Sequence, residues 1–360
     1  MVSVSKRKNS YLSEVLGSGH LYAALDLGTN NCRLLIAAPT KPGYFRVIDT
    51  FSRIIRLGEG MGHTRCLNNE AMNRTIKALK VCRFKLLQAN VTYQRLIATE
   101  ACRLADNGTD FIDRVSREVG LELEIIDRKT EARLAVSGCG TLVGQKTEAV
   151  VLFDIGGGSS EIALIDISKR RSPCLAEHII AWTSLPVGVM TLAEHFGNEI
   201  VTKKNFALMK DYVGKLLDTF SERYKLGHLT NHPSFYVLGT SGTITTLASI
   251  YLNLERYDRD RIDGMWLKSA DITRIIEVLL SWDMKQRIAN PCIGADRADL
   301  VLAGCAILEA IRSVWPSSRL RVADRGLREG ILTELMYQTG AWHKQSSSSA
   351  AFESIAPAKV

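Results

Sequence analysis

The sequence has no run of apolar residues that approaches the roughly 18 needed to cross a bilayer, so no membrane-spanning helix is expected. Its basic N-terminal residues are followed by neither an apolar core nor a small-residue cleavage site, which argues against a secretory signal peptide. The eight cysteines are scattered singly, without a CxxC motif and without a Cys/His pair at zinc spacing. These absences indicate a cytoplasmic protein without membrane contact, whose cysteines are small core residues in a reducing compartment.

The composition is ordinary, whereas the charge is not balanced. A hydrophobic fraction of 46% and a charged fraction of 23% are typical of a globular protein. At 360 residues the chain is expected to hold two domains of roughly 150 residues each. Its net charge of +8 favours polyanionic partners such as nucleic acid, polyphosphate or a multiply phosphorylated nucleotide. Nucleic acid is disfavoured, because the basic residues are dispersed and no strand combines aromatic with basic side chains.

What the sequence does contain is a glycine-rich turn that occurs twice. Residues 154–161 read DIGGGSSE after the apolar run 149–153, and residues 26–31 read DLGTNN after the apolar run 21–25. Each copy places an aspartate at the end of a buried strand, and glycine allows the backbone N–H groups of the turn to approach a ligand. Consecutive N–H groups form an anion-binding concavity, and the aspartate offers the hard oxygen ligand that magnesium prefers. Two such turns predict two related lobes that bind one phosphorylated substrate.

The order of the expected elements also repeats. Each half predicts three strands followed by alternating helices and strands, which is typical of a duplicated α/β lobe. The opening strands are expected at 21–25, 33–38 and 44–51 in the first half, and at 149–153, 161–167 and 177–185 in the second. The main helices are expected at 69–89, 109–120 with Thr109 as N-cap, from 131 onward, and at 203–224, 271–282, 297–314 and 325–337.

These elements divide the chain into two lobes that face each other across a cleft, which is where ligands usually bind. The first lobe is expected at 19–128, and a C-terminal helix at about 324–340 could pack back on it. The second lobe is expected at 129–323. The polar segments 1–18 and 343–360 are predicted to be a mobile N-terminal segment and a disordered tail.

Several further segments complete a resemblance to a known family. They are SRIIRLGEGM at 52–61, ATEACRLADN at 98–107, TEARL at 130–134, GTSGT at 239–243, RADLVLAG at 297–304 and DRGLREG at 324–330. Together with DLGTNNCRLL at 26–35 and DIGGGSSE at 154–161, the chain resembles the exopolyphosphatase and guanosine pentaphosphate phosphatase family in its short form. The resemblance implies two actin-like (ribonuclease H-like) α/β lobes around a central cleft, as in the actin, Hsp70 and sugar-kinase superfamily.

The acidic candidates follow from the residues and from the resemblance. Asp154 is the first choice for a Mg²⁺ ligand, with Mn²⁺ as a substitute, and Asp26 holds the equivalent place in the first lobe. The resemblance makes Glu131 the general base that activates water, although a carboxylate in the first turn of a helix is favoured in its ionised form. Glu161 is a second acidic candidate that could orient water. The alternative for Asp154 is a residue that only caps the turn, and for Glu161 a solvated strand residue. For Glu131 it is a simple first-turn glutamate, which would be the usual interpretation without the resemblance.

The phosphate-binding candidates are the two turns and a set of arginines. The turn residues are Gly28, Thr29, Asn30 and Asn31 in the first lobe, and Gly156, Gly157, Gly158 and Ser159 in the second. A guanidinium can hold phosphate with two hydrogen bonds, and the candidates are Arg33, Arg103, Arg297 and Arg56. A surface salt bridge is the alternative for each arginine.

The chain departs from the family pattern at Glu100 and Asn31, where relatives commonly carry serine. A carboxylate at Glu100 would repel phosphate if it pointed into the cleft. It is therefore expected either to face away or to pair with Arg103.

The resemblance implies a magnesium-dependent phosphoanhydride hydrolase that acts on polyphosphate or on guanosine penta- or tetraphosphate. One alternative is a regulator that binds these ligands with little turnover, against which the retained acidic residues argue. Another is an ATP-dependent kinase or ATPase of the same superfamily, against which TEARL and RADLVLAG argue. A homodimer is compatible with base rates of oligomerisation.

Overall fold

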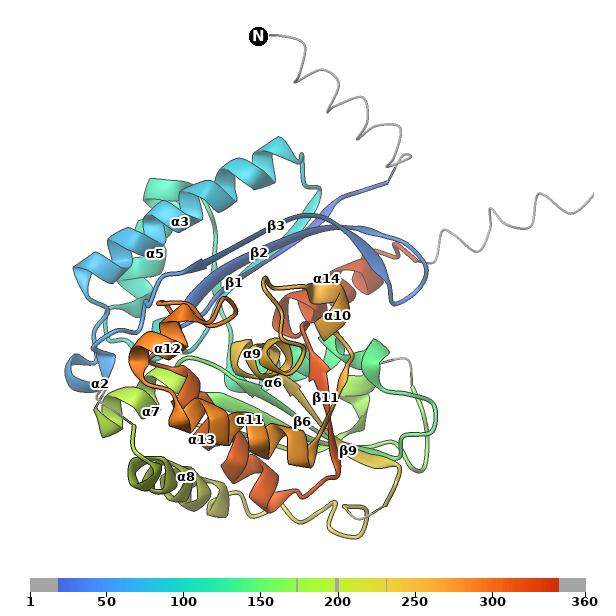
Figure 1. Cartoon of the computed structure of the whole chain (residues 1–360). Coiled ribbons are helices and arrows are strands. Elements are labelled where there is room, and N and C mark those ends of the chain that lie inside the picture. Colours follow the sequence, from blue (N-terminus) through green and yellow to red (C-terminus); the bar gives the residue numbers. More distant parts are fainter. Residues whose placement is uncertain (1–18, 173, 198–200, 231, 343–360) are drawn as a thin grey trace, which may run out of the picture.

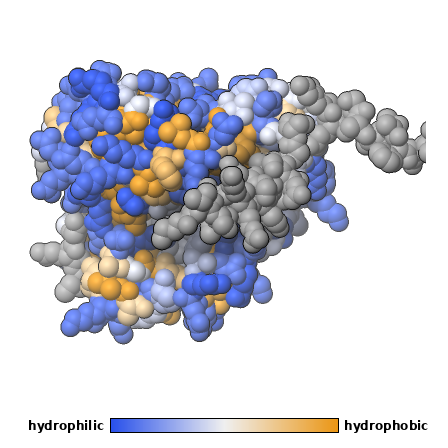
Figure 2. Space-filling model, turned by 90° about the horizontal axis from the view of Figure 1, so that it is seen from above, coloured by the Kyte–Doolittle hydropathy of each residue, from blue (hydrophilic) through white to orange (hydrophobic). Residues whose placement is uncertain are grey.

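The computed structural model describes residues 19–172, 174–197, 201–230 and 232–342. The expectations for the mobile segment 1–18 and the disordered tail 343–360 lie outside these residues. Two sheets, each with helices packed against it, build two stacked lobes (Figure 1). Among the described residues, no helix combines the length and the apolar character that a membrane crossing requires. Figure 2 shows a face covered mainly by hydrophilic side chains, with apolar ones in smaller groups.

The first lobe is built on a five-stranded sheet in the order β3-β2-β1-β4-β5. Its strands are β1 (Tyr22–Leu27), β2 (Asn31–Pro39), β3 (Phe45–Ile54), β4 (Tyr93–Ala98) and β5 (Glu124–Ile125). Its helices are α2 (Met61–Thr64), α3 (Asn69–Gln88), α4 (Glu100–Leu104) and α5 (Gly108–Val119). The first three strands are antiparallel neighbours, and β4 joins parallel to β1.

The second lobe repeats this plan on a six-stranded sheet in the order β10-β11-β9-β6-β7-β8. Its strands are β6 (Ala149–Ile155), β7 (Ser160–Asp166), β8 (Ile179–Leu185), β9 (Phe235–Thr240), β10 (Trp266–Lys268) and β11 (Arg319–Ala323). Again the first three are antiparallel neighbours, and the fourth, β9, joins parallel to the first. The predicted duplication of an α/β lobe is therefore confirmed, with β10 as an additional edge strand.

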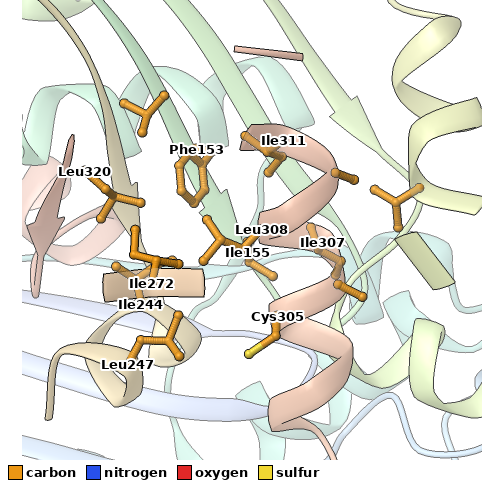
Figure 3. Packing of buried hydrophobic residues seen from close by; sticks show 14 of the residues in the cluster. Phe153, Ile155, Ile244, Leu247, Ile272, Cys305, Ile307, Leu308, Ile311 and Leu320 are labelled. Carbon is orange, nitrogen blue, oxygen red and sulfur yellow. The ribbon is translucent and has the colours of Figure 1, made fainter. Parts of the chain in front are cut away.

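The remaining elements are mostly helices. They are α6 (Arg128–Gly138), α7 (Val189–Phe196), α8 (Lys203–Asp218), α9 (Gly242–Tyr251), α10 (Arg259–Ile262), α11 (Ser269–Ser281), α12 (Met284–Ala289), α13 (Val301–Val314) and α14 (Leu327–Gln338), with short 3₁₀ turns at Gly140–Leu142 and Leu175–His178. Phe153 and Ile155 of β6 point toward Ile307, Leu308 and Ile311 of α13 in the core of the second lobe (Figure 3).

Several sequence expectations for these elements were wrong in their bounds. Helix α5 begins at Gly108 after Asn107, not after Thr109, because the Asn107 side chain accepts a hydrogen bond from Leu67 and joins the helix start to a distant loop. Helix α6 begins three residues before Glu131, because Asp127 accepts from Thr130 N–H and caps it. Helix α8 ends at Asp218 and does not reach Tyr224. Helices α2, α4, α7, α9, α10 and α12 were not predicted.

The C-terminal helix α14 packs on the first lobe, although it follows the last strand of the second. Its residues Leu327, Ile331, Leu332 and Met336 share a buried cluster with side chains of β1 and β2, and Tyr22 and Thr339 join their hydroxyls at 2.7 Å. This agrees with the expectation that a helix at about 324–340 packs back on the first lobe.

Helices α6 and α14 approach each other closely at two glycines. A Cβ on Gly138 would lie 2.0 Å from the carbonyl oxygen of Gly326, and one on Gly330 would lie 1.9 Å from that of Leu134. No side chain fits at either position, so backbone packs on backbone. This contact fixes α6, which carries Glu131, against α14 and the loop before it.

Candidate active site

The two lobes bring equivalent strand pairs to one cleft. In the first lobe Asp26 of β1 lies opposite Arg33 of β2, and in the second Asp154 of β6 lies opposite Glu161 of β7. The same seven-residue spacing and the same register produce both pairs. The cleft has a volume of about 760 Å³, and all four residues line it.

The two glycine-rich turns have the same backbone hydrogen bond. Gly28 N–H donates to Asn31 O and Gly156 N–H donates to Ser159 O, each at 2.9 Å. The other N–H groups of the turns are free: within the described chain, no hydrogen bond is donated by those of Thr29 and Asn30 or by those of Gly157, Gly158 and Ser159. Free N–H groups at a concave turn are what an anion such as phosphate requires.

The two turns also contact each other. A Cβ on Gly157 would lie 3.1 Å from Asn30 and one on Gly158 would lie 3.0 Å from Thr29 Oγ1, so only glycine allows this approach without displacement. The carbonyls of Gly156 and Gly157 accept from the first N–H groups of α7, which directs them away from the cleft. The Asn30 Oδ1 atom is buried and has no hydrogen-bond partner among the described residues, so it is available to a ligand.

Three carboxyl groups lie on the two strand pairs: Glu161 is buried, Asp26 and Asp154 are half-buried, and none of them forms an ion pair with another described residue. Burial raises the pKa of Asp154 to about 6 and that of Glu161 to about 7, and it also raises the pKa of Asp26. The neighbouring Arg33 partly opposes this for both aspartates. Burial of this kind favours the neutral acids, and a bound cation would favour their ionised forms.

Glu161 is held by two hydroxyl groups. Its Oε1 atom accepts from Ser159 Oγ and from Ser184 Oγ, each at 2.8 Å. Ser184 lies on β8 and was missed by the sequence reasoning, since no motif marks it. These bonds fix the carboxylate at the edge of the second turn.

Glu131 faces the cleft from α6. Burial and then the nearby Glu161 raise its pKa well above the usual value, while the Arg103 guanidinium opposes this rise. Arg103 Nη2 donates to Glu131 Oε2 at 3.0 Å. A buried carboxylate of raised basicity is suited to accept a proton from water.

Glu100 pairs with Arg103, which is one of the two arrangements expected for it. The carboxylate lines the cleft and is 3% exposed. Burial alone would raise its pKa, but hydrogen bonds from Arg128 and Arg103 outweigh burial and lower it. Of the predicted site residues, Arg103 and Arg56 do not line the cleft, and the Arg103 donors point to carboxylates of the wall.

Arg33 and Arg297 reach the cleft from opposite lobes. Within the described residues neither has an ion pair with a carboxylate. Burial and the proximity of Arg33 lower the pKa of Arg297. Arg56, by contrast, forms a two-pronged ion pair with Asp299 at 3.0 and 3.1 Å and so joins the two lobes.

Two further segments line the wall of the cleft. The segment DRGLREG carried the resemblance but was assigned no role, and Asp324 through Glu329 line the cleft beside Asp26. In GTSGT, Ser241 has φ 130°, a strained value for a residue other than glycine, and its Oγ is buried without a partner among the described residues. In both cases the signal available from the sequence was the motif itself, DRGLREG or GTSGT.

The residues fit a magnesium ion that is shared with phosphate. No three His, Cys, Asp or Glu side chains of the described residues converge on a ready-made metal site. Magnesium is commonly held by one or two carboxylates together with substrate phosphates and waters. Asp154 and Asp26, half-buried beside the free N–H groups of the turns, can supply such carboxylates.

The fold and the cleft define the class: a two-lobed actin-like α/β protein with a glycine-rich turn in each lobe and an aspartate near the end of the strand before it. Residues 36–339 match the model of the Ppx/GppA phosphatase family. The chain belongs to the Ppx/GppA phosphatase family and is a hydrolase of that family.

Individual relatives agree with this assignment. The chain is 28% identical over 316 residues to the "Putative exopolyphosphatase" of Haemophilus influenzae, covering 87% of this chain and 90% of that one. It is 27% identical over 342 residues to a "Bifunctional 3-dehydroquinate synthase/phosphatase" of Fusobacterium nucleatum, covering 92% of this chain but spanning only 47% of that longer protein.

Solved structures show the same architecture. The Aquifex aeolicus member of the Ppx/GppA family has a TM-score of 0.71 and 28% identity, with 89% of this chain and 99% of that chain covered. An exopolyphosphatase from Cytophaga hutchinsonii has a TM-score of 0.78 and 23% identity, with 89% and 98% covered, and shows the fold alone.

Proposed function

We propose that the protein is a magnesium-dependent phosphoanhydride hydrolase that releases the terminal phosphate of inorganic polyphosphate, of guanosine pentaphosphate, or of both. The observation that carries this proposal is the pair of turns whose free N–H groups meet beside the carboxyl groups of Asp26, Glu131, Asp154 and Glu161. Such turns bind phosphate, whereas the carboxyl groups serve a reaction that consumes water. A pure binding site would not need them.

Phosphate binding, proton transfer and metal binding fall to different residues of the cleft. The turns around Gly28 and Gly156 bind the phosphate oxygens through N–H groups, and Arg33 and Arg297 add positive charge. Glu131 accepts a proton from the attacking water, whose oxygen bonds to the terminal phosphorus as the bridging P–O bond breaks. Magnesium, held by Asp154 with Asp26 nearby, would neutralise charge on the phosphoryl oxygens.

The test is phosphate release by the purified protein with magnesium on long polyphosphate, guanosine pentaphosphate and ATP in parallel. We expect release from at least one of the first two and its loss in Glu131→Gln, with binding of the substrate largely retained. Glu70→Gln is the matched control, because Glu70 is also a first-turn glutamate but lies exposed on α3. It should behave as the unmodified protein.

Other outcomes would redirect the proposal. Binding of the guanosine nucleotide without turnover would favour a regulator, and turnover of ATP alone would favour an ATPase or a kinase. Loss of binding together with turnover in Glu131→Gln would mean that Glu131 is structural.

A further inference from the structure

The Glu100 carboxylate, which lies in the wall of the cleft, accepts hydrogen bonds from two arginines. Its Oε2 accepts from Arg103 Nε at 3.1 Å and also from Arg103 Nη2, while its Oε1 accepts from Arg128 Nη2 at 2.7 Å. The side chain also lies against the second turn, since a Cβ on Gly158 would be 3.3 Å from Glu100 Cγ. The Glu100 carboxylate therefore lies beside the second turn, and the two arginines donate their hydrogen bonds to it.

The donors of Arg103 are thereby committed to the protein. Nε and Nη2 donate to Glu100, Nη2 donates also to Glu131, and Nη1 donates to the Ile126 carbonyl oxygen. One guanidinium is shared between two carboxylates, and it does not line the cleft. It cannot present a two-pronged face to phosphate while Glu100 holds it.

We propose that Glu100 is a positioning residue that holds Arg103 away from the substrate phosphate and shares its guanidinium with Glu131. This inference rests on the proposed hydrolase function, in which Glu131 accepts the proton. Glu100 itself need not touch substrate. It acts through the guanidinium that it shares with Glu131.

The charged groups around Glu131 give the direction of each expected effect. Arg103 faces it from α4, Glu161 from β7 and Asp26 from β1, and Arg128 lies on its own helix. Without the Glu100 carboxylate, the Arg103 guanidinium pairs with Glu131 alone among the carboxylates, which stabilises the ionised form of Glu131 and lowers its pKa. Without Arg128, Glu100 pairs with Arg103 alone. The guanidinium then interacts more strongly with Glu100 and less with Glu131, so the pKa of Glu131 rises.

The substitutions Glu100→Gln and Arg128→Gln should move the acid limb of the pH dependence of kcat/KM in opposite directions. In Glu100→Gln the acid limb of kcat/KM should move down by about one pH unit, the size expected for one nearby charge, with a lower plateau rate. In Arg128→Gln the acid limb should move up. Glu124→Gln is the matched control, since it breaks an exposed bridge to Arg95 on the same sheet and should leave the limb in place.

Glu100→Asp separates positioning from simple charge. It keeps the negative charge but shortens the reach to the guanidinium. If Glu100 acts by holding Arg103, the acid limb in Glu100→Asp moves down as in Glu100→Gln. If it stays at the position of the unmodified protein, Glu100 acts only through space and the proposal is overturned.

A second readout does not require activity. Titration of the Glu131 carboxyl by ¹³C NMR in the metal-free protein should shift down in Glu100→Gln and up in Arg128→Gln. Shifts in the same direction in both, or a shift as large in Glu124→Gln, would overturn the proposal. If no phosphate is released from any substrate but these opposite shifts appear, the proposed hydrolase function fails while the positioning by Glu100 stands.

Discussion

Gly330→Ala tests whether the contact between α6 and α14 sets the geometry of the active site. The added Cβ would lie 1.9 Å from Leu134 O and 2.7 Å from its carbonyl carbon, whereas ordinary contacts begin at 3.4 Å. Both obstructing atoms are backbone, so no side-chain rotation can relieve the clash. The helices must separate instead.

The required separation sets the size of the effect. Restoring an ordinary contact needs about 1.5 Å of movement, and a misplacement of about 1 Å can lower a catalytic rate about 10²-fold. Glu131 lies three residues before Leu134 on α6, and Glu329 precedes Gly330 on α14, so both sides of the cleft wall would shift. Overpacking of this kind costs about 1–3 kcal/mol of folding free energy.

The assay combines kcat/KM with the melting temperature. We expect kcat/KM to fall about 10²-fold and the melting temperature to fall by roughly 2–4 °C per kcal/mol. Gly214→Ala is the control, because Gly214 lies within α8 with no atom within 4 Å of its added Cβ. It should leave kcat/KM unchanged and raise stability by about 1 kcal/mol. Unchanged activity in Gly330→Ala would refute the reasoning.

The remaining predictions concern buried charge and lobe closure. Burial raises the pKa of Asp154 to about 6, so the folded protein binds more protons than the unfolded chain, and its ionised form destabilises the fold as pH rises from about 4 through 6. Asp154→Asn should therefore abolish turnover yet raise the melting temperature of the metal-free protein at pH 8 but not at pH 4; a lower melting temperature at pH 8 would contradict this. Glu329, also buried but with a pKa lowered against burial by its arginine neighbours, should behave oppositely, and Glu329→Gln should lower the melting temperature at pH 8. Arg56→Gln removes the bridge to Asp299 and should raise KM several-fold, as expected for an ion pair worth up to about 1 kcal/mol, with a larger radius of gyration by small-angle scattering. Arg114→Gln, which breaks an exposed pair within one helix, should change neither.

The duplicated lobes have come to differ at one matched position. Arg33 and Glu161 occupy the same register on the second strand of their sheets, each opposite an aspartate. The first lobe therefore contributes a cation to the cleft and the second contributes a carboxylate. The symmetry of the backbone thus supports an asymmetric site.

The sequence alone determined the elements whose signal is local. A buried strand followed by an aspartate and glycines occurs twice at matched spacing, and this was sufficient to predict both turns and the duplicated lobes. The amphipathic period of α3 likewise predicted a helix within one residue of its observed end at Gln88. Short helices such as α4 and α7 were missed, because one or two turns contain too few residues to show a period.

Tertiary structure decided the features that depend on distant residues. The start of α5 depends on a hydrogen bond between Asn107 and Leu67, and the placement of α14 on the first lobe depends on apolar side chains of β1 and β2. The sequence left two arrangements open for Glu100, and the choice required Arg128, which lies 28 residues away along the chain. Charges interact through space and burial, whereas a sequence pattern records only what is near along the chain. The ionisation of the cleft is therefore a property of the fold.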